Sequence, residues 1–405
     1  MSLTWRQRCS AVLGNAMEYY DIAVFTSISM YISQMFTNQG IANSELIVWG
    51  VFAVRFLMRP FGGVVIGRYA DKNGRRRALV VCNFLTGLAT VAMALVPVSL
   101  LGPYVVVVFL LFQMVQAFGF GGEYPTLINY LMFDAQKNQR SRVSSMIVGS
   151  TILGIVASLL IVAGLKSILT EQEMGEWGWR IPLLVGVVNI FVSLHLRLSL
   201  PELPKTQRLS TRSSSSSILK VFGIAVLGAV IFYTQNLASG ILGKAMNIDN
   251  LALINTTMLV LFLFIFSFIV DRGFNPHKAL KFGTTVLLFA AVPLFLLLES
   301  SSFIYQAFAV IAISALIALI LGNMCAVLWD QCPNQTTSLG IGYNTALSIF
   351  GGLTPLIVSQ LMEPGVVYVG VYVALATLPT LFIFAHESPS GKTGLRQEPL
   401  TPVSR

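Results

Sequence analysis

Five ionisable residues lie inside stretches of the sequence that are otherwise apolar. Glu18 and Asp21 are three residues apart, so they share one helix face. Arg55 and Arg59 are four apart and share a face of a second helix. Glu123 lies in a third apolar stretch. A charge inside a bilayer is costly unless it is paired or faces water, so these side chains are candidates for function.

Mutual pairing of three acids with two bases would leave one acid over. At 1.5 Å per residue from the cytoplasmic ends of their predicted helices, four of the five lie roughly 10–16 Å deep, and Arg55 lies about a turn further in. A carboxyl group removed from water can hold and release a proton near neutral pH. We therefore expect Glu18, Asp21 and Glu123 to couple transport to protons. The alternative is a structural ion-pair cluster that holds the three helices together.

Polar residues inside the predicted helices are candidates for contact with a solute. A carboxylate solute needs a cation, and Arg55 is the first candidate, whereas Arg59 precedes Pro60 and its alternative role is to set helix geometry. In the C-terminal half of the chain, the polar groups inside the predicted helices are neutral. For each amide side chain there, the alternative role is hydrogen bonding between helices. The predicted substrate-binding residues are Tyr19, Arg55, Arg59, Gln113, Gln116, Gln235, Asn236, Asn323, Tyr343 and Asn344.

The composition places these residues in a membrane protein. The 405 residues are 55% hydrophobic and 11% charged, whereas soluble chains carry roughly 25% charged residues. The mean hydropathy is +0.76. About 20 apolar residues cross a bilayer as a helix, so we predict an all-α fold in the lipid bilayer. The twelve predicted spans are 11–36, 45–69, 78–98, 104–133, 143–166, 180–200, 218–243, 250–270, 279–299, 302–328, 338–362 and 365–385.

The distribution of basic residues predicts the orientation. With the N-terminus inside, 21 of the 26 Lys and Arg residues lie in cytoplasmic segments, as the positive-inside rule requires. An even number of spans returns the C-terminus to the cytoplasm. The net charge of +9 is thereby explained by orientation, and nucleic acid is not expected as a partner.

A serine-rich linker divides the chain into two six-span halves. We predict an N-terminal bundle over 1–200, a cytoplasmic linker over 201–217, a C-terminal bundle over 218–386 and a cytoplasmic tail over 387–405. The halves echo each other, since Asp71-Lys72 follows the second span and Asp271-Arg272 follows the eighth. Two repeats of six spans are typical of transporters that bind solute between the halves.

The loop from Gly67 to Arg77, GRYADKNGRRR, carries the most specific pattern. Its spacing, GxxxD(K/R)xG(R/K)(R/K), resembles the signature of the major facilitator superfamily. The resemblance implies that Asp71 caps a neighbouring helix end and that basic residues brace the cytoplasmic gate of the outward-open state. A plain positively charged loop is the alternative. The predicted gating residues are Gly67, Asp71, Gly74, Arg75 and Arg76.

Four further segments resemble the metabolite:proton symporters of that superfamily, which include proline/betaine, α-ketoglutarate, citrate and shikimate carriers. They are GNAMEYYD at 14–21, FLMRPFGG at 56–63, GFGGEY at 119–124 and WGWRIP at 177–182. The resemblance covers nearly the whole chain and is strongest over 11–205. The family usually has Arg at the position of Gln113 and a small residue at that of Arg55, so we hypothesise that Arg55 replaces the lost charge from the neighbouring helix.

These observations predict a proton-coupled secondary transporter for the uptake of an amino acid, betaine or organic acid by alternating access, in a bacterial inner membrane. A proton-driven efflux antiporter is the alternative, and a non-transporting receptor or scaffold is more remote. We expect no enzyme activity, because no nucleophile–base pair is apparent. Four cysteines without a CxxC motif and three histidines without a cluster predict no metal and no cofactor. We expect a monomer.

Overall fold

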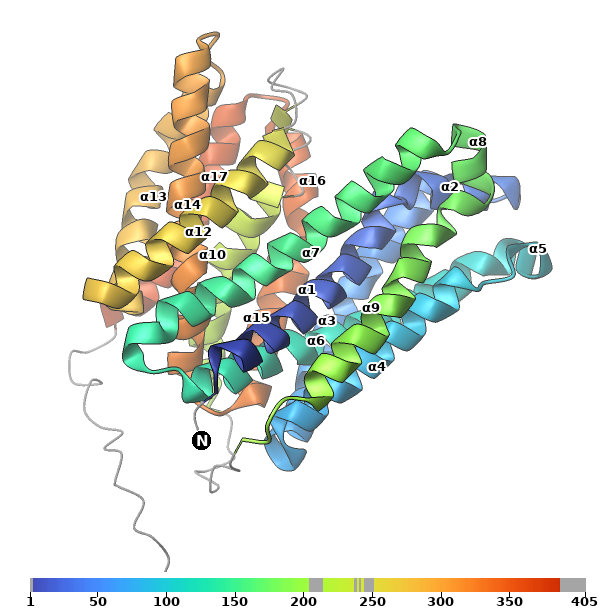
Figure 1. Ribbon diagram of the computed structural model, residues 1–405. Helices are drawn as coiled ribbons and strands as arrows, with labels where there is room; N and C mark the ends of the chain where they lie inside the picture. The colour runs from blue at the N-terminus through green and yellow to red at the C-terminus, as the bar shows by residue number, and fades with distance from the viewer. Residues whose placement is uncertain (1–2, 204–213, 237–238, 240–241, 244–250, 387–405) are drawn as a thin grey trace, which may run out of the picture.

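The computed structural model describes residues 3–203, 214–236, 239, 242–243 and 251–386, and these residues form an all-α fold. Figure 1 shows two bundles of helices, one coloured blue to green and the other yellow to red. Among the described residues, eleven helices are long and apolar enough to cross a membrane. The first bundle contains α3 (Ser44–Asn73), α4 (Arg75–Ala94), α6 (Val105–Asp134), α7 (Arg140–Ile168) and α9 (Arg180–Leu198).

The second bundle continues this pattern after the predicted linker. Its helices are α10 (Ser215–Asn236), α12 (Leu251–Gly273), α13 (Pro276–Leu298), α14 (Phe303–Gln331), α15 (Thr336–Ala346), α16 (Gly352–Leu361) and α17 (Val366–His386). A π-helical turn, Leu347–Gly351, joins α15 to α16 within one span. The helix α10 begins at Ser215, so three serines assigned to the linker form its first turn. The end of the seventh predicted span and the C-terminal tail lie outside the described residues.

The first predicted span consists of two helices, α1 and α2, and with the eleven helices above it makes up the twelve predicted spans. The helix α1 (Trp5–Ser27) begins with a capping box in which the Thr4 side chain accepts from Gln7 N. It ends at Ile28, where α2 (Ser29–Asn38) begins. Glu18 and Asp21 lower the mean hydropathy of α1, and the helix breaks a few residues after them. For these reasons α1 is not among the eleven helices that are apolar enough to cross a membrane, although it packs within the bundle.

The outer surface of both bundles is apolar. Large hydrophobic side chains are exposed along most of the long helices, including Phe61 on α3, Phe191 on α9, Phe289 on α13 and Phe382 on α17. Exposure of this extent would drive association of a protein in water. Contact with lipid chains removes that cost, so the surface is suited to a bilayer.

Two aspartates join the bundles at one end of the molecule. Asp71, at the end of α3, accepts hydrogen bonds from Thr336 N and Thr337 N at 2.8 and 3.0 Å. Asp271, near the end of α12, accepts from Ser141 N and Arg142 N at 2.9 and 3.1 Å. Each carboxylate therefore satisfies free N–H groups in the first turn of a helix from the opposite half. The repeated sequence pattern corresponds to a repeated contact.

We call this end of the molecule the basic end, because Arg75, Arg76 and Arg77 in the first turn of α4 lie there. Arg140 of α7 forms an ion pair with Asp330 of α14 at 2.9 Å. Arg75 donates to Asn334 Oδ1 across the halves at 2.8 Å. Figure 1 shows the two bundles meeting at this lower end, where the N-terminus lies, and diverging at the opposite end.

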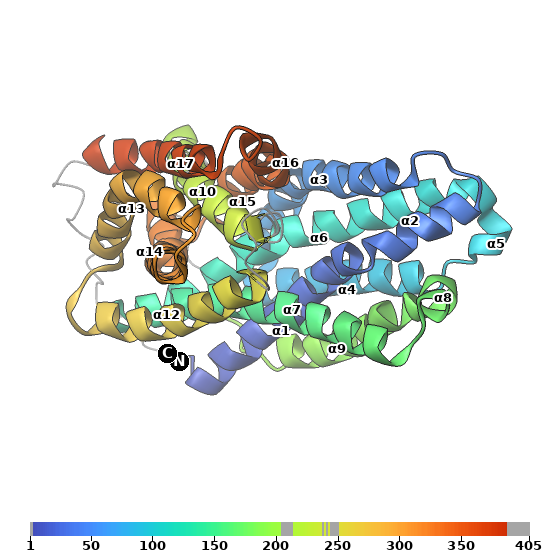
Figure 2. The same ribbon diagram turned by 90° about the horizontal axis from the view of Figure 1, so that it is seen from above.

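Glycine permits the close approach of α3 and α15 at the basic end. A Cβ atom on Gly63 would lie 2.8 Å from Gly340 O, and one on Gly67 would lie 2.9 Å from Thr337 Cα. Both distances are shorter than van der Waals contact, so a larger residue would force the two halves apart. Figure 2, viewed from above, shows α15 beside α3 where the two bundles meet.

Loss of the cap at Asp71 should open the basic end. In a protein that keeps Cys332 as its only cysteine, Asp71→Ala should raise the rate of maleimide labelling of Cys332 about fivefold, because a lost helix cap costs about 1 kcal/mol. Cys332 is buried at the end of α14, close enough to Asp71 to interact with it electrostatically. Asp134→Ala is the matched control, because Asp134 pairs with Arg8 inside one half. Equal labelling rates in the two variants would contradict the assignment.

Candidate functional site

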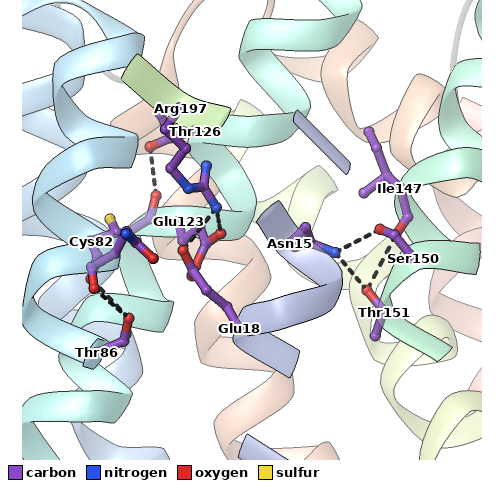
Figure 3. Close-up of polar contacts among 12 residues, drawn as sticks. Asn15, Glu18, Cys82, Thr86, Glu123, Thr126, Ile147, Ser150, Thr151 and Arg197 are labelled. Carbon is purple, nitrogen blue, oxygen red and sulfur yellow. Dashed lines mark hydrogen bonds and ion pairs between the residues drawn. The ribbon is translucent and has the colours of Figure 1, made fainter. Parts of the chain in front are cut away.

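Arg197 joins two helices through a buried ion-pair cluster. Its Nη2 atom lies 2.8 Å from Glu18 Oε1 of α1 and also contacts Glu123 Oε1 of α6. All three side chains are at most 3% exposed. Figure 3 shows both carboxylates directed at the guanidinium, which enters from the last turn of α9. We call these three residues the Arg197 cluster.

The cluster corrects the predicted pairing of charges. The sequence analysis paired the acids with Arg55 and Arg59, whereas the structure pairs Glu18 and Glu123 with Arg197. Arg197 was assigned to a cytoplasmic segment because it lies near the end of a span. Its side chain is completely buried, since α9 packs along α1 and α4 and the helix end is covered by them.

The cluster is not saturated with hydrogen bonds. Glu18 Oε2, Glu123 Oε2 and Arg197 Nη1 are buried and have no hydrogen-bond partner among the described residues. Asp21, one turn from Glu18, is 3% exposed and forms no ion pair in the described part of the chain. A Cβ on Gly186 would lie 2.5 Å from Asp21 Oδ1, so this glycine makes room for the carboxylate. Two acids thus share Arg197, and a third, Asp21, lies near Glu18.

Asn15 connects the same face of α1 to α7. Its Nδ2 atom donates to Ser150 Oγ at 2.9 Å and to Thr151 Oγ1 at 3.2 Å, as Figure 3 shows. Asn15 lies three residues before Glu18, so both occupy one side of the helix. Since Thr151 lines the central cavity, α1 links the cluster to the cavity wall.

A central cavity of about 530 Å³, including its opening to solvent, lies between the halves. The N-terminal half contributes Tyr19, Tyr124, Val148 and Thr151 to its wall. The remaining lining residues come from the second half: Gly228, Ala229, Phe232, Tyr233, Leu321, Met324, Cys325, Leu328, Tyr343 and Leu347. Of the predicted binding residues, Tyr19 and Tyr343 are therefore on the cavity wall.

Two acid–tyrosine dipeptides divide their side chains between cluster and cavity. In Glu18-Tyr19 and Glu123-Tyr124 the acid contacts Arg197 and the tyrosine lines the cavity. Consecutive side chains on a helix point roughly 100° apart, so a helix can serve both sites. Tyr124 stacks on Tyr343 of the opposite half, with ring centroids 5.0 Å apart.

Arg59 is a buried cation beside the cavity. It is 5% exposed, and its Nε and Nη2 atoms have no hydrogen-bond partner among the described residues. Its guanidinium interacts electrostatically with Tyr19, Tyr233 and Tyr343, all of which line the cavity. Arg59 thus has donors available next to the cavity.

Arg55 lies within the N-terminal half and contacts the position at which the family usually has Arg. Its Nη1 donates to Gln113 Oε1 at 2.8 Å, and Gln113 Nε2 contacts Met93 Sδ at 3.1 Å. The guanidinium therefore occupies space next to the missing charge, in agreement with the exchange hypothesis. Gln116 donates to Thr90 Oγ1 at 3.0 Å. Among these three predicted binding residues, none is part of the described cavity wall.

The amides of the second half mostly bond to neighbouring helices or to their own. Gln235 donates to Ser314 Oγ at 2.8 Å and lines a smaller cavity within this half. Asn236 donates to Phe232 O and Asn323 to Leu319 O, one turn earlier in the same helices. Asn344 donates across the halves to Gly121 O at 2.7 Å. These contacts favour the helix-joining role for the amides over solute contact.

The predicted gating residues lie together at the basic end. Asp71 caps α15, which confirms the role implied by the family resemblance. Gly67 lies against Thr337, and Gly74 has φ 105°, a value that favours glycine, between α3 and α4. Arg75 donates to Asn129 O and Asn334 Oδ1, and Arg76 contacts Leu198 O.

Sequence reasoning missed several residues of the site. Tyr124, Thr151, Tyr233 and Cys325 line the cavity, but their types are common in buried helices. The sequence around Arg197 does indicate burial, because the arginine lies among leucines in Leu194-His195-Leu196-Arg197-Leu198. An arginine in so apolar a segment is itself a candidate for burial.

Comparison with known proteins agrees with this architecture. Residues 8–219 match the family model described as "Sugar (and other) transporter". The alpha-ketoglutarate permease of Escherichia coli is 28% identical over 386 residues, which cover 89% of each chain. The ectoine/proline transporter of Corynebacterium glutamicum is 26% identical, with 94% of this chain and 81% of that one covered. The Escherichia coli proton:xylose symporter has the same fold, with a TM-score of 0.73 at 15% sequence identity. The match covers 94% of this chain and 95% of the symporter.

Removal of the cation from the cluster should destabilise the protein. Arg197→Gln leaves two carboxylates facing each other without a base, which should cost roughly 3–5 kcal/mol and lower the Tm measured in detergent. Adding Glu123→Gln to this variant should recover part of the loss. Arg76→Gln is the control, because its partner Glu202 is exposed and such pairs contribute at most about 1 kcal/mol. If Arg197→Gln and Arg76→Gln unfold at the same temperature, the cluster does not stabilise the bundle.

Proposed function

This chain belongs to the sugar (and other) transporter family of the major facilitator superfamily, and on that premise we propose that it imports a small zwitterionic or carboxylate metabolite together with protons. It is a membrane transporter and not an enzyme. Alternating access would expose the central cavity first on one side of the bilayer and then on the other. The Arg197 cluster would hold the coupled proton, and the cavity would hold the solute.

The observation that carries the proposal is the excess of acid around Arg197. Glu18 and Glu123 face one guanidinium and Asp21 lies near Glu18, so full ionisation would leave two uncompensated negative charges in this buried region. An uncompensated charge inside a membrane costs about 2.5–3.5 kcal/mol by insertion scales. Binding of protons removes this cost. A site of this kind can take up protons at one membrane face and release them at the other.

The residues on and beside the cavity wall support a solute that carries a carboxylate. Arg59 has unpartnered N–H groups beside the cavity, and a guanidinium binds carboxylates through two parallel hydrogen bonds. Tyrosine rings supply faces that attract an ammonium or alkylammonium group. The names of two relatives refer to α-ketoglutarate, ectoine and proline, all of which carry a carboxylate. We therefore assign Arg59, rather than Arg55, as the solute cation site.

The orientation follows from the charges of the basic end. The arginines after α3 lie at this end, and the positive-inside rule assigns such loops to the cytoplasm. With that assignment the structure is closed on the cytoplasmic side by Asp71, Asp271 and the Arg140–Asp330 pair. The relatives are bacterial, so we place the transporter in an inner membrane, acting as a monomer because the cavity lies within one chain.

A proton-driven efflux antiporter would use the same fold and the same acids. The two functions differ in the direction of solute movement relative to the proton. An exporter would expel solute as protons enter, whereas an importer would accumulate it. The Arg59 site favours import of an anionic or zwitterionic metabolite, since hydrophobic cations would be repelled by a buried guanidinium.

Transport in proteoliposomes tests the proposed function. With an acidic outside, proline, glycine betaine or α-ketoglutarate should accumulate, and a protonophore should abolish the accumulation. Glu123→Gln should lose at least tenfold of the gradient-driven uptake while solute exchange continues, because exchange needs no net proton movement. Loss of preloaded solute from the lumen into an acidic exterior would instead indicate an exporter. Absence of any flux would leave a receptor.

Replacement of Arg59 should weaken carboxylate binding specifically. Removal of a charged hydrogen-bonding partner costs about 1.5–3 kcal/mol, so Arg59→Gln should raise the Kd for the carboxylate solute roughly 10- to 100-fold. The Kd would be measured by thermal shift or calorimetry on purified protein. Arg55→Gln is the matched control and should change the Kd less, because Arg55 contacts Gln113 inside the bundle. A larger effect at position 55 would reverse the assignment.

A further inference from the structure

Two helices of the N-terminal half contain a proline. Each proline removes the backbone N–H that would donate to a carbonyl one turn earlier in the same helix. Pro60 lies inside α3 and Pro125 inside α6. Proline has no N–H, so it cannot bond to the carbonyl four residues earlier. These carbonyls belong to Phe56 and Gly121. A buried carbonyl without a donor is costly, so each requires another partner.

Both carbonyls receive their hydrogen bond from the opposite half. Asn344 Nδ2 donates to Gly121 O at 2.7 Å, and Ser348 Oγ donates to Phe56 O at 2.6 Å. Asn344 and Ser348 are four residues apart, so they occupy one face of the eleventh span. Gly340, four residues before Asn344, lies on the same face against Gly63.

From these contacts we propose that Asn344 and Ser348 latch the two halves together by bonding to the carbonyls whose helical donor proline removes, and that proton binding at the Arg197 cluster weakens this latch. The inference rests on the proposed proton-coupled function. Asn344 and Ser348 are thereby positioning residues of the transport cycle rather than solute ligands. We call the two cross-half hydrogen bonds the carbonyl latch.

The two carbonyls belong to one rigid unit. A Cβ on Gly62 would lie 1.9 Å from Phe118 O, and one on Gly121 would lie 2.1 Å from Arg59 O. The backbones of α3 and α6 are therefore in direct contact, and a shift of α6 must carry α3 with it. One movement would break both bonds of the latch.

The Arg197 cluster is connected to this unit through Glu123. Glu123 lies two residues after Gly121, and Tyr124, the next residue, stacks on Tyr343 of the opposite half. With both acids ionised, Arg197 holds α6 against α1 and α9. Protonation of Glu123 removes that attraction and allows α6 to shift, which would strain the Gly121–Asn344 bond.

The groups that face Glu123 come from several helices. Arg197 and Glu18 contact or neighbour it directly. The titratable groups on the surrounding elements are Glu18, Tyr19 and Asp21 on α1, Arg55 and Arg59 on α3, Cys82 on α4, Arg197 on α9, Cys325 on α14 and Tyr343 on α15.

The latch is tested by measuring the opening of the basic end directly. Spin labels would be attached at Arg77→Cys and Lys278→Cys, two exposed positions in opposite halves, in a protein without its four native cysteines. Distances between the labels would be measured by pulsed electron resonance from pH 5.5 to pH 8.5. The native latch should give mainly the short distance at high pH and a rising long-distance fraction as the pH falls.

Loss of one latch bond should shift this equilibrium. Asn344→Ala and Ser348→Ala should each raise the ratio of open to closed protein at pH 8 about fivefold, since one hydrogen bond contributes about 1 kcal/mol. The pH midpoint of opening should also move upward, because less protonation is then needed. Asn323→Ala and Ser267→Ala are the matched controls, since these buried side chains bond within their own helices.

A double variant separates the latch from a general packing effect. Pro125→Ala supplies an N–H that bonds to Gly121 O within α6, so Asn344→Ala should change the equilibrium less than twofold in that background.

Glu123→Gln should make the distances independent of pH. Identical distances in the latch variants and their controls would overturn the proposal. If the distances respond as expected but proteoliposomes show no proton-driven uptake, the latch stands and the proposed function fails.

Discussion

The buried guanidinium of Arg197 lies between carboxylates from α1 and α6, and the arrangement of the N-terminal half depends on this contact. A charge in an apolar interior must find a counter-charge or lose its own. Here one base contacts two acids and a third acid, Asp21, lies near Glu18, so the charges of the region balance only when protons are bound. The same constraint that holds three helices together thus makes their contact sensitive to protons.

The two halves contribute different kinds of side chain to the interior. Among the described residues, the buried aspartate, glutamate and arginine side chains belong to the first half, where α1, α3, α6 and α9 carry them. The second half contributes aromatic and aliphatic side chains to the cavity and neutral donors to the contact between halves. A neutral surface can slide against a charged one without breaking ion pairs in the middle of the bilayer. The ion pairs and helix caps between the halves lie instead at the basic end, as in the Arg140–Asp330 pair.

Glycine and proline serve this movement in opposite ways. Glycines such as Gly62 and Gly121 bring the backbones of α3 and α6 into contact, so the two helices form one unit. Prolines in the same helices leave carbonyls that accept hydrogen bonds from the opposite half. Internal stiffness of each bundle and exchangeable bonds between bundles are the properties that alternating access requires.

The sequence by itself determined the number and position of the spans, because about 20 apolar residues are needed to cross a bilayer and the chain has no other use for such runs. It also determined that Glu18, Glu123 and Arg59 are buried, since their neighbours are apolar, and that Asp71 caps a helix. Only the tertiary structure decided which charges meet. Arg197 reads as a loop residue until α9 packs along α1. The partners of Asn344 and Ser348 are more than 200 residues away in sequence, and such contacts depend on how two bundles dock, which no local pattern of residues records.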